Sequence, residues 1–174
     1  MGHSGIFLTR CAHFLLDQLD AGQWDLLADL AEEQAPQIEE YAYGRLVLIE
    51  AFRRAYDGDL PPGTTGLDVD AVRAYSRYLY EIDGVMSLRR AQTFGAVFQG
   101  MTPAQLAALD AVVDAGYESW PEVDDPIPSG TGGTVKSGLM TYASQMFSWY
   151  GGHVHADTYF CPERHGTYFG SFYM

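Results

Sequence analysis

The chain has 174 residues, of which 47% are apolar and 14% aromatic, and this length and composition indicate one folded domain rather than a disordered chain. The chain contains ten Lys and Arg residues and 23 Asp and Glu residues, so its formal net charge is −13. This charge disfavours binding to nucleic acid phosphates and favours binding to cations. No apolar run approaches the ~20 residues that span a bilayer, so the sequence predicts no membrane insertion and no nucleic-acid partner.

Apolar residues recur at helical spacing from the N-terminus to the middle of the chain. The pattern predicts one helix from Phe7 to Leu19 and another from Trp24 up to Pro36. Proline suits the first turn of a helix, where its missing N–H would have no partner, so a third helix is expected from Pro36 to Asp57. The third helix is predicted to bury one stripe: Ile38, Ala42, Leu46, Ile49 and Phe52.

A loop at 59–66 contains two adjacent prolines and precedes the next predicted helix. Asp68 is expected to cap this helix, and Gly84 is expected to end it, because Gly is a weak helix former that often follows a last turn. The inward face is predicted to carry Val72, Tyr75, Leu79 and Ile82. A further helical segment follows from Val85 to Gln99.

The clearest local signal in the sequence is a helix start at Thr102. Thr102 is the expected N-cap, Pro103 the first helical residue, and Gln105 the partner that completes a capping box. Gly116 is expected to end this helix in a left-handed conformation.

Residues 119–133 are rich in Pro, Gly and acidic side chains, and they predict a loop. A loop of this length in a compact domain is expected to be either mobile or functional. Glu122, Asp124 and Asp125 could hold calcium, but they lack the spacing of a calcium loop, so a solvated turn is the favoured interpretation. A last helix is predicted at 134–150, with one strong apolar stripe: Leu139, Tyr142, Ala143, Met146, Phe147 and Tyr150.

Beyond Gly152 the apolar period changes from about 3.6 residues to about 2, which indicates strands. A strand from 153 to 161 would place on one face His153, His155, Asp157, Tyr159 and Cys161. A turn containing His165 and a returning aromatic strand would complete a β-hairpin over 153–174.

Three of the five histidines of the chain therefore gather in this segment. His153 and His155 on one strand face would direct two imidazoles to one point, and His165, Cys161 or Asp157 could supply further ligands. Imidazole with thiolate favours zinc or copper. The leading hypothesis is a copper- or zinc-binding protein, with a redox or hydrolytic centre as an option. No catalytic residue is assigned.

The sequence is also compatible with two other functions. The spacing matches no complete zinc or haem signature, so the histidines could be incidental. The aromatic C-terminal strand could then dock on a protein partner or on a second copy of the chain, by strand addition. A weaker alternative is a small-molecule pocket lined by Tyr and Trp between helices.

The chain has two cysteines, Cys11 and Cys161. They could form a disulfide, which would indicate a secreted or periplasmic protein, or they could be two reduced thiols in a cytoplasmic one. The sequence favours neither.

Together these patterns predict a mainly α fold, an irregular bundle of about five to seven helices with a short C-terminal β-hairpin. All of 1–174 is expected to form a single domain, with helices in 1–118 and 134–150, the loop at 119–133 and the hairpin segment at 153–174.

Overall fold

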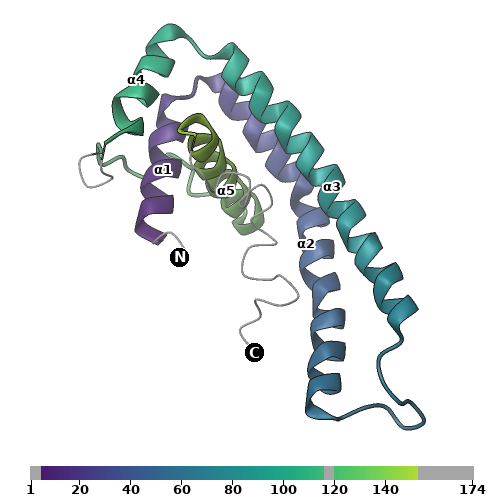
Figure 1. The fold of residues 1–174 in the computed structure, drawn as a ribbon. Helices are drawn as coiled ribbons and strands as arrows, with labels where there is room; N and C mark the ends of the chain where they lie inside the picture. Colours follow the sequence, from purple (N-terminus) through teal and green to yellow (C-terminus); the bar gives the residue numbers. More distant parts are fainter. Residues whose placement is uncertain (1–4, 116–119, 153–174) are drawn as a thin grey trace. The chain divides into compact units, whose positions relative to one another are not determined.

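The computed structural model describes residues 5–115 and 120–152. These residues form the helices α1 (Gly5–Gln18), α2 (Ala21–Asp57), α3 (Val69–Gly100), α4 (Pro103–Val113) and α5 (Gly133–Tyr150), drawn in Figure 1. The prediction of a mainly α chain is confirmed. The described ranges contain no strand, and the predicted hairpin at 153–174 lies outside them.

Contacts group the described residues into two compact units. Unit 1 holds residues 5–35, 89–115 and 120–152, and unit 2 holds residues 36–88. Helices α2 and α3 contribute residues to both units. The single domain expected from the sequence stays a prediction.

Two predicted helix boundaries are wrong. Helix α2 continues through Pro36, and α3 continues through Gly84. An interior Pro costs a helix ~3 kcal/mol and an interior Gly ~1 kcal/mol relative to Ala. Burial of apolar side chains on both sides of each residue offsets these costs, as with Leu30 and Tyr41 around Pro36. Tertiary packing therefore decides the length of both helices.

The core of unit 1 lies where α1 packs against α5. Cys11 and Leu15 on α1 are fully buried. The stripe predicted for the last helix is confirmed, because five of its members are fully buried: Leu139, Tyr142, Ala143, Met146 and Phe147. Helix α4 also contacts α1.

The capping box predicted at Thr102 is present. The Thr102 hydroxyl accepts a hydrogen bond from the backbone N–H of Gln105 at 3.3 Å, and the Gln105 side chain accepts one from the backbone N–H of Thr102 at 2.7 Å. The Gln105 amide also donates to the carbonyl of Gln18 at 2.7 Å, which ties α4 to the end of α1. Helix α4 ends at Val113, and Gly116, which was expected to end it in a left-handed conformation, lies outside the described residues.

Unit 2 is a helical hairpin, in which the second part of α2 packs against the first part of α3 (Figure 1). Tyr41 and Leu48 of α2 and Leu79 and Met86 of α3 form its buried core. The helices approach closely at Gly44, where an added Cβ would lie only 2.7 Å from Cδ2 of Leu79. The inward face predicted for α3 is confirmed: Val72, Tyr75, Leu79 and Ile82 all belong to this core or pack against it.

Candidate functional site

The predicted metal ligands lie in the C-terminal segment, outside the described residues: His153, His155, Asp157, Cys161 and His165. Within 5–115 and 120–152, no group of three or more His, Cys, Asp or Glu side chains is placed to hold a metal ion. Metal binding by the C-terminal ligands therefore stays a prediction.

Cys11, on α1, is fully buried. Burial raises its pKa to about 12, so the thiol stays protonated at neutral pH and is a poor nucleophile. Cys161 lies outside the described residues, so a disulfide between the two cysteines also stays a prediction.

The described part of the loop after α4 is anchored by buried side chains. Trp120 is 5% exposed and Ile127 is 4% exposed. The ring of Trp120 lies 4.8 Å from that of Phe147 in an edge-on arrangement, and its indole N–H donates to the carbonyl of Ala115 at 3.1 Å. The described part of the loop is therefore packed into the core of unit 1.

Two carboxylates of this loop, those of Glu122 and Asp125, pair with cationic side chains of the chain itself. Glu122 accepts a hydrogen bond from Arg10 at 2.9 Å. Asp125 accepts one from Lys136 and another from the backbone N–H of Ile127, and these bonds lower its pKa. The contacts support the interpretation of a solvated turn over that of a calcium site.

Unit 1 also contains a buried polar cluster of Gln34, Arg90 and Tyr142, all fully buried. The amide oxygen of Gln34 accepts hydrogen bonds from Nε of Arg90 and from the hydroxyl of Tyr142, both at 2.8 Å. The Arg90 guanidinium lies 4.8 Å from the centre of the Tyr142 ring. No pattern in the sequence indicates this cluster, because a Gln or Arg in an amphipathic helix normally faces water. Its role is to join α2, α3 and α5.

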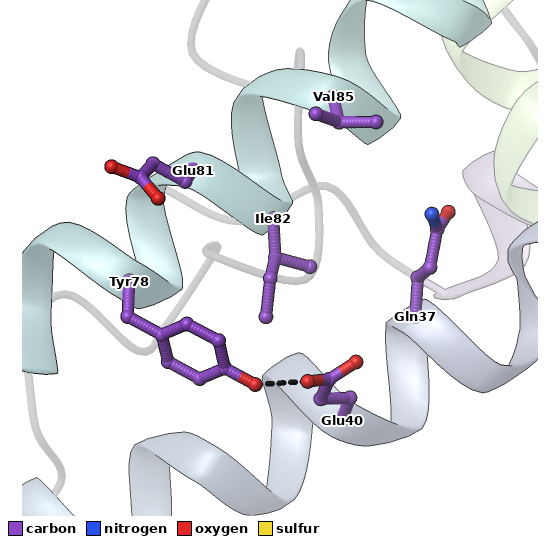
Figure 2. Close-up of a pocket in the computed structure, with 6 residues that line it drawn as sticks. All are labelled: Gln37, Glu40, Tyr78, Glu81, Ile82 and Val85. Carbon is purple, nitrogen blue, oxygen red and sulfur yellow. Dashed lines mark hydrogen bonds between the residues drawn. The ribbon is translucent and has the colours of Figure 1, made fainter.

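The concave site described in unit 2 is a groove between α2 and α3 of about 250 Å³, shown in Figure 2. The residues that line it come from both helices: Gln37, Glu40, Tyr78, Glu81, Ile82 and Val85. In Figure 2 the Ile82 side chain projects from α3 toward α2, between Tyr78 and Gln37. The small-molecule pocket considered in the sequence analysis would be lined by Tyr and Trp side chains. The lining of this groove contains one Tyr, Tyr78, and no Trp.

A hydrogen bond from the Tyr78 hydroxyl to the Glu40 carboxylate spans the groove (Figure 2). This bond and the nearby charge of Glu40 raise the pKa of Tyr78, so the phenol remains a neutral donor. Glu40, Tyr78, Glu81 and Val85 are exposed. The groove is therefore an open, acidic and partly apolar surface.

Unit 2 also exposes large apolar side chains on both of its helices. On α2 the exposed fractions are 69% for Tyr43, 55% for Leu46 and 56% for Val47. On α3 they are 59% for Val85 and 62% for Leu88. The prediction that Leu46 faces inward is wrong. Leu48, next to Tyr41 on the side facing α3, is buried instead.

No protein-family model, no curated protein and no solved structure matches this chain. Among the described helices, none combines the length and the apolarity needed to cross a membrane. Neither finding identifies a family, so the function is inferred from the residues of this chain.

Proposed function

We propose that this chain is a protein-interaction module that binds its partner through the helices of unit 2. The observation that carries the proposal is the exposed apolar face of α2, where Tyr43, Leu46 and Val47 lie at positions i, i+3 and i+4 and are each more than half exposed. This spacing places the three side chains on one side of the helix. Exposed apolar side chains gathered in this way are typical of surfaces that another protein covers.

The interaction surface differs from the one expected on the sequence. The sequence hypothesis placed docking on the aromatic C-terminal strand, whereas the support from the described residues lies on α2 and α3. Val85 and Leu88 add a second exposed apolar face on α3. Partner docking on a helix surface uses side chains at helical spacing, and it leaves the backbone hydrogen bonds of the helix intact.

A photo-crosslinking experiment tests this proposal. A photoreactive amino acid replaces Val47 or Leu88 in the full chain, and Asp59 in the loop between α2 and α3 serves as the exposed control position. We expect a discrete protein adduct from Val47 or Leu88 and none from Asp59 when the chain is irradiated in its native extract. Equal labelling at all positions, or no adduct at Val47 and Leu88, would contradict the proposed function.

As a second function we propose copper or zinc binding through the C-terminal segment. It is supported by the clustering of His153, His155 and His165 in the sequence, with Cys161 and Asp157 as further potential ligands, and by a net charge of −13 that attracts cations. Because the described residues hold no candidate metal group, tight binding would have to involve residues outside them.

Elemental analysis of protein purified without a chelator or a nickel column tests the metal proposal. We expect close to one copper or zinc per chain, and its loss in the double variant His153→Ala/His155→Ala. The variant His3→Ala is the matched control and should keep the metal, since it removes a histidine outside the C-terminal segment. Metal-free native protein, even after reloading and dialysis, would exclude this function.

A further inference from the structure

The geometry of the groove in unit 2 points to the chemistry of the partner. We propose that the groove between α2 and α3 binds a basic amphipathic helix of another protein, which places a Lys or Arg side chain beside Glu40 and Glu81. This inference rests on the proposed interaction function and specifies the partner that one face of the module accepts.

The apolar part of the groove is a stripe along α3. Tyr78, Ile82 and Val85 follow one another at intervals of four and three residues, so they share one face of the helix. Tyr78 is 41% exposed and Val85 59%. A stripe of this kind matches the apolar side of a partner helix, whose anchors recur at the same spacing.

Acidic groups flank the stripe. Glu40 rises from α2 and Glu81 from α3, and both line the groove (Figure 2). The hydrogen bond from Tyr78 restrains the Glu40 carboxylate and keeps one of its oxygens engaged. A Lys or Arg side chain of the partner would lay its aliphatic stem on Ile82 and Val85 and its charge near the carboxylates and the Tyr78 ring.

Charge selects a basic partner over a second copy of the chain. The chain has a net charge of −13, so two copies repel each other, while a basic partner is attracted over a distance and associates faster. An acidic partner helix would also meet like charges at Glu40 and Glu81. The favoured occupant is therefore a different, basic protein.

The openness of the groove favours a protein over a small molecule. Small-molecule sites enclose most of the surface of their ligand. Here most of the lining side chains are exposed: Glu40, Tyr78, Glu81 and Val85. A groove of about 250 Å³ with such an exposed lining would contact only one side of a bound ligand.

Fluorescence anisotropy with two labelled synthetic peptides tests the inference on the full chain. The first peptide is a helix of Leu and Lys with Leu at i, i+3, i+4 and i+7, and the second carries Glu in place of every Lys. The variant pair Glu40→Gln/Glu81→Gln removes the groove carboxylates and leaves the Glu40 position an acceptor for Tyr78. The pair Glu50→Gln/Asp57→Asn removes the same charge at exposed positions of α2 outside the groove lining.

We expect the Lys peptide to bind and the Glu peptide not to bind. The double variant Glu40→Gln/Glu81→Gln should raise the Kd for the Lys peptide about fivefold, as expected for the loss of two exposed ion pairs. The control Glu50→Gln/Asp57→Asn should raise this Kd less than about twofold. Val85→Ser should also weaken binding, by loss of apolar contact. Circular dichroism checks that every variant is folded.

Equal increases in Kd for the two variant pairs would overturn the inference, because the attraction would then come from net charge alone. The same holds if Val85→Ser leaves the Kd unchanged. Either result would leave the proposed interaction function standing, since that depends on the adducts at Val47 and Leu88. If those adducts are absent but the Lys peptide binds the groove specifically, the proposed function is contradicted. The inferred preference of the groove for a basic helix then still holds.

Discussion

Replacing Gln34 with Met is expected to lower the free energy of unfolding by about 2–5 kcal/mol, because the change removes an acceptor shared by two buried donors. Nε of Arg90 and the hydroxyl of Tyr142 both donate to the Gln34 amide oxygen at 2.8 Å. Methionine fills a similar volume, so little of the loss would come from a cavity. Urea denaturation followed by far-ultraviolet circular dichroism measures the effect.

A double-mutant cycle assigns the loss to the buried cluster. Tyr142→Phe alone should cost about 1 kcal/mol, whereas in the Gln34→Met background it should cost nothing or restore part of the lost stability, because it removes a buried donor that has lost the Gln34 acceptor. Glu32→Met, at an exposed position of α2 in the same unit, is the matched control and should change stability by less than about 0.5 kcal/mol. Stability of Gln34→Met equal to that of the control would show that the shared acceptor contributes nothing.

Replacing Trp120 with Ala is expected to cost about 3–5 kcal/mol, the usual range for removing a large buried aromatic side chain. Trp120 is only 5% exposed, its ring contacts those of Phe147 and Phe14 at centroid distances of 4.8 and 6.3 Å, and its indole donates to Ala115. Limited proteolysis should also detect faster cleavage within 120–132, because Trp120 holds the start of this loop in the core.

Two further variants separate the contributions of Trp120. Trp120→Phe keeps an aromatic ring and loses the hydrogen bond, so its cost should stay near ~1–2 kcal/mol. Tyr56→Ala removes an aromatic ring that is 79% exposed and should be within about 0.5 kcal/mol of the parent. If Trp120→Ala were as stable as Tyr56→Ala, the loop would not belong to the folding core.

Apolar spacing and local hydrogen-bond chemistry were sufficient to predict part of the fold. The apolar stripe of α5 and the inward face of α3 follow from helical periodicity, because burying those side chains requires them to share one face. The capping box at Thr102 follows from a contact between neighbours in sequence, which is independent of the rest of the fold.

The helix boundaries, and the helix faces that are buried, were decided by contacts between residues far apart in sequence. Pro36 and Gly84 were predicted to separate helices, yet burial on both sides of each residue keeps α2 and α3 continuous. Leu46 was predicted to face inward, yet α3 lies against the side of α2 that carries Leu48, so Leu46 is exposed. The stripe containing Leu46 had the right spacing for burial, and spacing alone does not say which side meets a neighbouring helix.

By itself, the sequence determined that the chain is acidic and mainly helical, and it determined which residues begin α4 and which side of α5 is buried. These properties depend on composition and on neighbours within a few residues. Only the tertiary structure decided that Gln34 and Arg90 are buried and that the carboxylates of Glu40 and Glu81 line one groove. The reason is physical: polar side chains are placed by the partners that packing brings to them, and those partners come from distant parts of the chain.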